Sequence, residues 1–370
     1  MNQKYKVMVI FGTRPEAIKM APLIPELQKY PDTFEALSCS TGQHREMLKQ
    51  VLEIFEITPT YELDVMVPNQ TLAGLTSRLI QRLDSLFGEV RPDCVLVHGD
   101  TTTSLAAALA AYYHKIPVGH VEAGLRTYDR YQPFPEEMNR HLVDALSTFH
   151  FAPTQTAANH LVKENINNDY ICITGNTVID ALQLVVKKPC ELPLDIDWEN
   201  KKVILVTAHR RENHGKPLED ICNALHKIVD TYPDVEIIYP VHYNPNVKEP
   251  VFKRLGDIDR IHLTEPLHYL QFSHLMSKSY LILTDSGGIQ EEAPSLGVPV
   301  LVLRDVTERP EAVEAGTVRV VGTDTERILA EVDRLMDMGN HQAMAQAANP
   351  YGDGTASTRI VNILKEALAS

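Results

Sequence analysis

The sequence predicts an α/β protein built from two doubly wound, Rossmann-like domains that face a central cleft. At 370 residues the chain is too long for one ordinary domain and suits two. Short apolar runs rich in β-forming residues alternate with segments of helical periodicity along the whole length. Because these runs are continuously apolar, they are typical of parallel strands that helices cover on both faces.

The expected strands form two series along the chain. The first series comprises residues 6–11, 36–40, 94–97, 118–121, 150–152 and 170–173. The second comprises residues 203–206, 236–239, 260–263, 280–284, 298–303 and 317–321. Twelve strands would be unusual in one parallel sheet, whereas two sheets of six fit two doubly wound domains.

Helical segments separate most of these strands, for example residues 104–114, 218–232 and 326–338. The domain boundary is expected between residues 175 and 200, where a helix-like segment at 177–186 leads into a polar, proline-containing stretch at 187–200. We therefore expect an N-terminal domain at residues 1–175 and a C-terminal domain at 176–354. The final helix, within 355–370, can pack on either domain and so can cross back to the N-terminal one.

Composition excludes several classes of protein. The hydrophobic fraction of 44% and the charged fraction of 23% are ordinary for globular proteins. Apolar runs are of strand length, and the N-terminus has no signal-peptide pattern, so no membrane association is expected. The net charge of −14 makes nucleic acid an improbable partner, although a local cluster of donors can still bind a small phosphorylated ligand.

The five cysteines are odd in number, widely spaced and never in a C-x-x-C pair. This pattern argues against a disulfide framework and against a structural zinc site. It favours a reducing compartment, and we expect a cytoplasmic protein.

Candidate site residues are sought at the carboxyl ends of the strands, where ligands bind in open α/β sheets. After the first strand, Pro15 is suited to start a helix, with Arg14 at its N-terminus and Lys19 one turn further on. The glycine patterns of dinucleotide and triphosphate sites are missing. Taken alone, the two cations would be a solvated surface.

Two acids follow consecutive parallel strands of the first half. Asp100 comes after the strand at 94–97, and Glu122 ends the strand at 118–121. Asp100 alone could be a helix N-cap, but an acid placed as Glu122 is costly to bury unless it is used or paired. We favour a general acid and base function for the pair. Glu136 and Glu137 taken alone suit the N-terminus of a helix.

The second half offers donors for phosphate. Ser286, Gly287 and Gly288 form a turn whose backbone can approach a diphosphate closely before a helix begins. Glu292 lies one turn into that helix, within reach of ribose hydroxyls. A glycine pair alone is weak evidence, but Arg14, His209 and Ser286 all fall at the carboxyl ends of strands, and Arg309 follows the fifth strand of the second series.

Several longer motifs resemble those of the non-hydrolysing UDP-N-acetylglucosamine 2-epimerases. The motifs are FGTRPEAIKMAP at 11–22, VHGDTTT at 97–103, GHVEAGLRT at 119–127, PEEMNR at 135–140, ITGNTVID at 173–180, LTDSGGIQEEAP at 283–294 and TERPE at 307–311. They run in order from residue 11 to about residue 354. Several are long enough to be highly specific.

The resemblance implies a glycosyltransferase-B-like pair of domains with UDP held mainly by the C-terminal one. It implies interconversion of UDP-N-acetylglucosamine and UDP-N-acetylmannosamine in the cytoplasm by a homodimer, with no metal, NAD or other cofactor. The product would supply N-acetylmannosamine units for cell-surface polysaccharides. By motif position the active-site residues are Arg14, Lys19, Asp100, Glu122, Glu136 and His209, and the nucleotide contacts include Phe272, Ser286, Gly287, Gly288, Glu292 and Arg309.

The resemblance also implies a second, allosteric site for UDP-N-acetylglucosamine. The matching positions are Gln43, Arg210 and His242, with His44 adjacent and Glu136 shared with the active site. Asn69 stands where many relatives have arginine, so we expect weaker binding of the effector. The sequence departs from the family pattern a second time at Leu267, where some relatives have a polar residue near the nucleotide base.

The chemistry of this reaction fits the residue types. A proton on sugar carbon 2 becomes acidic only when UDP leaves the anomeric carbon, so opposed acid and base groups and stabilisation of the diphosphate are needed. The alternatives are a hydrolysing 2-epimerase, a glycosyltransferase of the same architecture and a catalytically silent nucleotide-sugar sensor. The length of the motif match argues against the transferase, and the intact carboxylates argue against the sensor.

Overall fold

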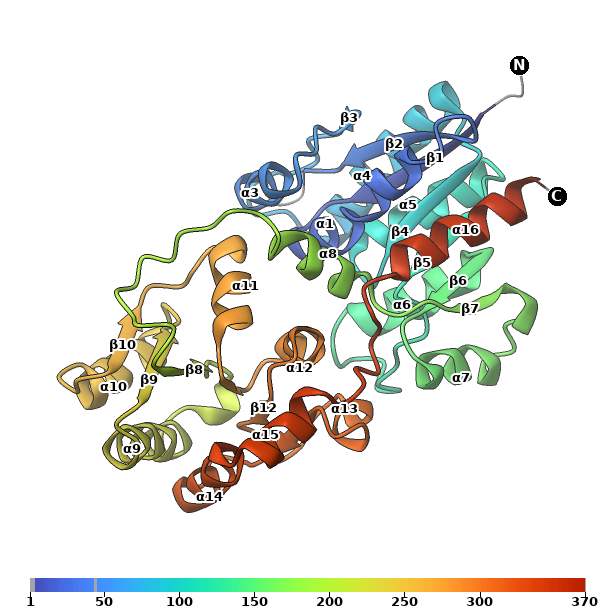
Figure 1. Ribbon diagram of the computed structural model, residues 1–370. Coiled ribbons are helices and arrows are strands. Elements are labelled where there is room, and N and C mark those ends of the chain that lie inside the picture. Colours follow the sequence, from blue (N-terminus) through green and yellow to red (C-terminus); the bar gives the residue numbers. More distant parts are fainter. Residues whose placement is uncertain (1–3, 43–44, 370) are drawn as a thin grey trace. The chain divides into compact units, whose positions relative to one another are not determined.

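The computed structural model describes residues 4–42 and 45–369, and the chain divides into two compact units (Figure 1). The first unit contains residues 1–184 and 351–370, and the second contains residues 185–350. The first unit therefore takes in residues 176–184 and 351–354, which were expected in the C-terminal domain. Both ends of the chain belong to it.

Hydrogen bonds explain why the last segment belongs to the first unit. The backbone N–H of Asn176 donates to Tyr351 O at 2.7 Å. Asp180 lies on α8 (Thr177–Val185) and accepts from the backbone N–H groups of Ser357, at 2.7 Å, and Ala356, at 3.2 Å. These two N–H groups open α16 (Ala356–Ala369), which packs against α2 (Leu23–Gln28). Asp180 thus serves as an N-terminal cap for a helix that is distant in sequence.

The first unit contains a parallel sheet in the order β3-β2-β1-β4-β5-β6-β7. Its strands are β1 (Tyr5–Phe11), β2 (Phe34–Ser40), β3 (Tyr61–Glu62), β4 (Cys94–His98), β5 (Val118–Val121), β6 (Phe149–Ala152) and β7 (Ile171–Ile173). Besides α2, α8 and α16, its helices are α1 (Arg14–Met20), α3 (Arg45–Phe55), α4 (Leu72–Val90), α5 (Thr102–Tyr113), α6 (Glu136–Leu146) and α7 (Gln155–Lys163).

The second unit contains a parallel sheet in the order β10-β9-β8-β11-β12-β13. Its strands are β8 (Lys202–Thr207), β9 (Val235–Pro240), β10 (Ile261–Thr264), β11 (Leu281–Thr284), β12 (Val300–Val302) and β13 (Val318–Val320). Its helices are α9 (Lys216–Thr231), α10 (Pro245–Leu255), α11 (Tyr269–Lys278), α12 (Gly287–Glu292), α13 (Pro310–Glu314), α14 (Thr325–Met336) and α15 (Met338–Ala345).

The expected fold class of two doubly wound α/β domains is confirmed. Each of the twelve expected strands is present, with ends within two residues of the expected ones. The expectation of six strands in the first sheet was wrong, since the described residues give seven. The missed strand, β3, has only two residues and lies at the edge of the sheet, so it forms no apolar run that periodicity can detect.

In each sheet the order of the strands reverses next to the first strand. In the first sheet β1 lies between β2 and β4, and in the second β8 lies between β9 and β11. The crossover connections therefore leave to opposite sides at these points, which opens a crevice at the carboxyl ends of the strands in each sheet. The residues that follow β1 and β4, and those that follow β8 and β11, are placed to meet a ligand.

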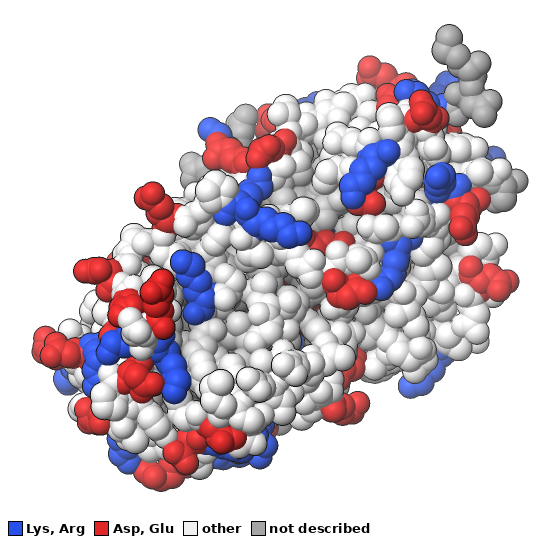
Figure 2. Space-filling model, viewed as in Figure 1, with Lys and Arg blue, Asp and Glu red and all other residues white. Residues whose placement is uncertain are grey.

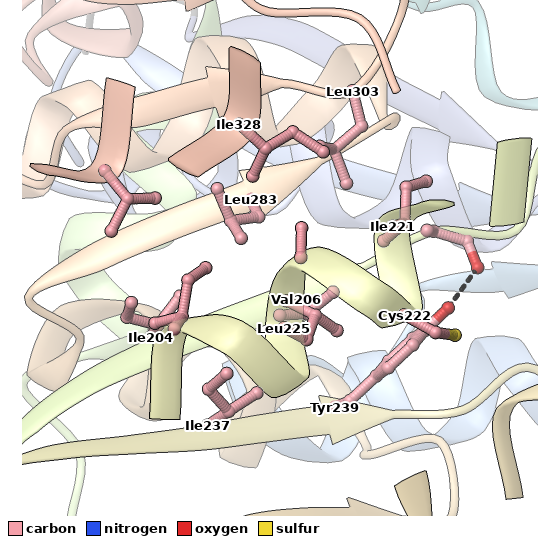
Figure 3. Packing of buried hydrophobic residues seen from close by; sticks show 14 of the residues in the cluster. Ile204, Val206, Ile221, Cys222, Leu225, Ile237, Tyr239, Leu283, Leu303 and Ile328 are labelled. Atoms are coloured by element: carbon pink, nitrogen blue, oxygen red, sulfur yellow. Dashed lines mark hydrogen bonds between the residues drawn. The ribbon is translucent and has the colours of Figure 1, made fainter. Parts of the chain in front are cut away.

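The core of the second unit holds the end of β8 in position (Figure 3). Ile204, Val206 and Leu283 point into one apolar cluster with residues of α9 and β9. Tyr239 is fully buried in that cluster, and its hydroxyl donates to Ala208 O at 2.7 Å. The backbone just before His209 is therefore anchored to the core.

Acidic and basic side chains are interspersed over the face drawn in Figure 2. Within residues 4–42 and 45–369, no helix is both long and apolar enough to cross a bilayer. Over the same residues, no cluster of three or more His, Cys, Asp or Glu side chains is arranged to hold a metal ion.

Candidate functional site

The loop between β1 and α1 is held by a buried acid. Thr13 is the N-cap of α1, and Glu16 accepts from the backbone N–H groups of Thr13, at 2.7 Å, and Gly12, at 3.1 Å. Glu16 also accepts from Thr101 Oγ1 at 2.6 Å, which ties this loop to the one after β4. Arg14 is the first residue of α1, as the sequence predicted, and Lys19 lies in its last turn.

Glu122 lies directly after β5 and is buried, with 6% of its surface exposed. Its φ of +64° is a left-handed conformation that non-glycine residues rarely adopt, and such strain is concentrated at functional sites. The carboxylate forms an ion pair with Lys19 Nζ and accepts from Asn176 Nδ2 at 3.0 Å and Arg140 Nη2 at 3.1 Å. The buried acid is thus fully paired.

Asp100 joins this group through Arg140. Arg140 Nη2 lies 2.7 Å from Asp100 Oδ2, and Arg140 Nη1 donates to Glu122 O at 2.9 Å. Asn139 Nδ2 donates to Asp100 O at 2.8 Å. Asp100 is not the N-cap of α5, because Thr101 occupies that position. The alternative explanation of Asp100 as a helix cap is therefore wrong.

The charges around Glu122 keep it ionised. Burial raises the pKa of this carboxyl, but Lys19, His98 and Arg140 more than compensate and hold the pKa well below its ordinary value. His98 Nε2 is 3.6 Å from the carboxylate and makes no hydrogen bond to any described residue. The site therefore combines an ionised carboxylate with several cations at the carboxyl ends of β4 and β5.

Glu136 is the first residue of α6 and is half-buried. It lies four residues before Arg140, so the two share one face of the helix. Glu137 has a structural role, since it accepts from the backbone N–H groups of Tyr128 at 2.9 Å and Thr127 at 3.0 Å. The two adjacent acids therefore have different surroundings in the structure.

In the second unit, His209 follows β8 and stacks on His242, with ring centroids 5.5 Å apart. Its Nδ1 lies 3.5 Å from Asp285 Oδ1. Burial lowers the pKa of His209, and His242 and Arg210 lower it further, while Asp285 acts in the opposite direction. On balance these groups disfavour the charged form of the ring in the free protein.

The turn after β11 lies beneath two guanidinium groups. Ser286 is the N-cap of α12, and a Cβ at Gly287 would lie 3.8 Å from Arg210 Nη2 and 3.9 Å from both Arg309 Nη2 and Glu308 Oε2. Arg309 forms an ion pair with Glu291, which fixes its orientation. The structure thus brings both arginines to the predicted glycine turn, an arrangement suited to phosphate oxygens.

The remaining nucleotide positions also belong to the second unit. Glu292 ends α12, and its Oε1 would lie 3.3 Å from a Cβ at Gly288. Phe272 is half-buried on α11.

The structure describes only some of the residues expected at the allosteric site. Gln43 and His44 lie outside the described residues. Arg210 is 3.2 Å from Glu308 in an ion pair, and His242 Nδ1 accepts from the backbone N–H of Asn244 at 3.0 Å. Asn69 is exposed in the first unit, with φ of +55°.

Four residues of these groups were missed from sequence: His98, Arg140, Asn176 and Asp285. Each lies inside a motif that had been noted; Asp285 is directly beside Ser286, and Arg140 is one helical turn from Glu136. The spacing of four between Glu136 and Arg140 was a usable signal. Nothing local indicated that Asn176 would reach Glu122.

Comparison with known proteins gives a consistent result. The family model of UDP-N-acetylglucosamine 2-epimerase matches residues 26–365. The UDP-N-acetylglucosamine 2-epimerase of Bacillus subtilis (strain 168) is 55% identical over 363 residues, covering 98% of this chain and 95% of the relative. That of Escherichia coli (strain K12) is 56% identical over 370 residues, covering 97% and 98%.

Solved structures agree. The UDP-GlcNAc 2-epimerase of Neisseria meningitidis, bound to UDP-GlcNAc, matches with a TM-score of 0.82 at 52% identity, covering 98% of this chain and 100% of that one. The enzyme of Methanocaldococcus jannaschii matches with a TM-score of 0.87 at 36% identity, covering 98% and 99%. The chain therefore belongs to the UDP-N-acetylglucosamine 2-epimerase family.

Proposed function

We propose that this protein interconverts UDP-N-acetylglucosamine and UDP-N-acetylmannosamine by eliminating and re-adding UDP, without hydrolysis. The observation that carries the proposal is the pair of carboxylates, Asp100 and Glu122, bridged by one buried arginine at adjacent strand ends. Relatives above 50% identity that are named for this activity support it.

The reaction begins at the anomeric carbon. The C1–O bond breaks and UDP leaves with the electron pair, so positive charge develops at C1 and the C2–H bond becomes acidic. A carboxylate takes the proton, and the C–H electrons form a C1–C2 double bond, which leaves a glycal beside UDP. Protonation of C2 on the opposite face and return of UDP to C1 complete the epimerisation.

The first unit supplies the groups that act on the sugar. Glu122 is ionised at neutral pH and can accept a proton or stabilise positive charge at C1. Asp100 and Glu136 are the other carboxylates that we assign to proton transfer. We also assign Arg14 and Lys19 to stabilisation of the negative charge on the diphosphate as it leaves.

The second unit binds UDP in this proposal. Arg309 lies near Gly287, where the backbone carries no side chain, so phosphate oxygens can approach closely. We assign Ser286, Gly288, Glu292, Phe272 and His209 to the rest of the nucleotide. No metal ion, NAD or other cofactor is required by this scheme.

Proton NMR of the purified protein with UDP-N-acetylglucosamine in D2O tests the proposal. We expect deuterium at C2 and formation of UDP-N-acetylmannosamine while UDP stays attached to sugar at equilibrium. Release of free N-acetylmannosamine would indicate a hydrolysing enzyme. Transfer of the sugar to an added acceptor, with no reaction before the addition, would indicate a glycosyltransferase. An unchanged spectrum would indicate a sensor.

We also propose a second UDP-N-acetylglucosamine site that includes Gln43, His44, Arg210 and His242. Because Asn69 offers only a neutral hydrogen bond, effector binding is expected to be weak. A progress curve started from pure UDP-N-acetylmannosamine tests this site, with and without a trace of UDP-N-acetylglucosamine. Full initial velocity without the trace, and no response to it, would refute the site.

Assembly and location remain proposals as well. We propose a homodimer. Size-exclusion chromatography with light scattering will test it, because a dimer has twice the mass of the 41.5 kDa chain. We propose a cytoplasmic location, in keeping with free thiols at all five cysteines. Fractionation of cells that produce the protein will test it.

A further inference from the structure

Asp285 organises the loop that carries His209. It follows β11 directly and is fully buried. One carboxylate oxygen, Oδ2, accepts from the backbone N–H groups of His209 and Arg210, each at 2.8 Å, and from Asn213 Nδ2 at 3.0 Å. Three donors therefore fix the orientation of this carboxylate within the second unit.

The other oxygen, Oδ1, faces the imidazole of His209. It makes no hydrogen bond to any described residue, and it lies 3.5 Å from His209 Nδ1. A buried carboxylate oxygen without a donor is costly, so a proton on Nδ1 is strongly favoured. The Nδ1–H tautomer of His209 places a donor opposite Oδ1 at 3.5 Å, which is longer than an ordinary hydrogen bond.

Two contacts lie beside the backbone and the ring of His209. Tyr239 holds the preceding carbonyl, Ala208 O, at 2.7 Å (Figure 3), and the ring stacks on His242 with an interplanar angle of 15°. With Nδ1 facing Asp285, the nitrogen left for a ligand is Nε2. The side chain is 43% exposed, so a ligand can reach it.

We infer that Asp285 is a positioning residue for the reaction: it holds His209 in the Nδ1–H tautomer and stabilises the imidazolium that donates from Nε2 to the diphosphate of UDP. The inference rests on the proposed function and deepens it. When UDP binds, the neutral ring takes one proton from solvent onto Nε2, and that N–H then donates to a phosphate oxygen. As UDP leaves the sugar, this donor stabilises the added charge on the leaving group.

The groups that face His209 explain why UDP is needed for protonation. In the free protein, burial, His242 and Arg210 disfavour the charged ring, and Asp285 alone does not overcome them. The diphosphate adds negative charge on the Nε2 side. The ring then lies between two anions, and its pKa rises.

The decisive variant is Asp285→Asn. The three donors at the Oδ2 position select the amide oxygen there, so the amide NH₂ replaces Oδ1 and donates to Nδ1. This inverts the tautomer while leaving the loop intact, and a comparable change at a catalytic aspartate–histidine pair lowers kcat about 10⁴-fold. The matched control is Asn213→Ala, which removes one donor from Oδ2 but keeps the carboxylate beside the ring.

Nitrogen NMR of His209 and calorimetry with UDP in buffers of different ionisation enthalpy provide the readouts. In the wild type and in Asn213→Ala we expect the Nδ1–H tautomer and uptake of a proton on binding UDP at pH 7. In Asp285→Asn we expect the Nε2–H tautomer, no proton uptake and kcat lower by a factor of about 100 or more, with a smaller change in KM.

The wild type alone can overturn the inference, even if a variant does not fold. An Nε2–H tautomer in the free wild type, or UDP binding without proton uptake, would refute it. Equal losses of kcat in Asp285→Asn and Asn213→Ala, with unchanged tautomers, would reduce Asp285 to a purely structural role. Because these readouts use UDP binding, they stay separate from the C2 exchange in D2O, which decides the proposed function itself.

Discussion

The guanidinium group of Arg140 lies 2.7 Å from the carboxylate of Asp100, and the same nitrogen, Nη2, lies 3.1 Å from Glu122 Oε1. One cation thus holds two acids that follow different strands. Arg140 is itself buried in the first unit, so the three groups form a low-dielectric network in which removal of one partner leaves a charge uncompensated.

Arg140→Met is expected to destabilise the protein by about 3–5 kcal/mol, because the buried Glu122 and the partly exposed Asp100 lose the cation that they share. Arg140→Lys should destabilise it less but still lower turnover, since an ammonium group cannot reproduce the guanidinium contacts. Urea unfolding followed by circular dichroism measures the stability. The control is Arg304→Met, whose partners Glu212 and Glu308 are exposed and whose loss should cost about 1 kcal/mol or less. Equal stability of Arg140→Met and wild type would contradict the network.

Asp100→Asn and Glu122→Gln are each expected to reduce turnover by roughly 10²–10⁴-fold, as is typical for loss of a general acid or base. UDP affinity should change little, because we assign UDP binding to the second unit. Initial rates and calorimetric titration with UDP measure the two effects. Near-normal turnover in both variants would remove these acids from the mechanism.

The lowered pKa of Glu122 makes its contribution to stability dependent on pH. Above the pKa of an unfolded glutamate, about 4.3, the carboxyl is ionised in both states and the contribution is complete. As the pH falls through that value towards the lower pKa of the folded state, the unfolded chain binds the proton first and the contribution is lost. The stability difference between wild type and Glu122→Gln should therefore be constant from pH 6 to 8 and should shrink below about pH 4.3. Midpoints of urea unfolding for both proteins across this pH range test the direction of the change. A stability difference that grows as the pH falls would be inconsistent with a lowered pKa of Glu122.

Gly287→Val should weaken UDP binding by about tenfold or more, equivalent to about 1.4 kcal/mol. The side chain would occupy the space between the backbone and the two guanidinium groups, where we propose that the diphosphate lies. The fold should persist, because a Cβ there meets no atom closer than 3.8 Å. Gly88→Val in α4 is the control, since its Cβ meets only His114, at 3.7 Å, and UDP affinity should not change. An unchanged dissociation constant for Gly287→Val would exclude this position from the nucleotide site.

Gly124→Ala tests how the segment after Glu122 is held. Gly124 has φ of +82°, and an added Cβ would overlap the carbonyl oxygen of Ala157, so both strain and a backbone clash are expected. The predicted loss of stability is about 2–4 kcal/mol. Gly316→Ala is the matched control, because its φ of +75° is similar but nothing lies within 4 Å of the added carbon. It should lose only about 1–2 kcal/mol, and thermal unfolding will compare the two.

The sequence by itself determined the architecture and the positions of most candidate residues. Continuous apolar runs and helical periodicity are local properties, so the twelve strands could be predicted within two residues of their ends. Parallel strands all present their carboxyl ends at one edge, and this is why Arg14, Asp100, Glu122 and Ser286 could be selected from their positions along the chain.

Only the tertiary structure decided which groups pair with these residues. Asn176 reaches Glu122 across 54 positions, and Asp285 reaches His209 across 76, whereas periodicity reports only on neighbours a few residues apart. The two-residue strand β3 forms because β2 offers a free edge, and residues 351–354 join the first unit because Asn176 binds Tyr351 there. Burial then sets the charge states: the same glutamate or histidine would titrate normally in the unfolded chain, and its pKa shifts only when folding removes water and brings distant charges together.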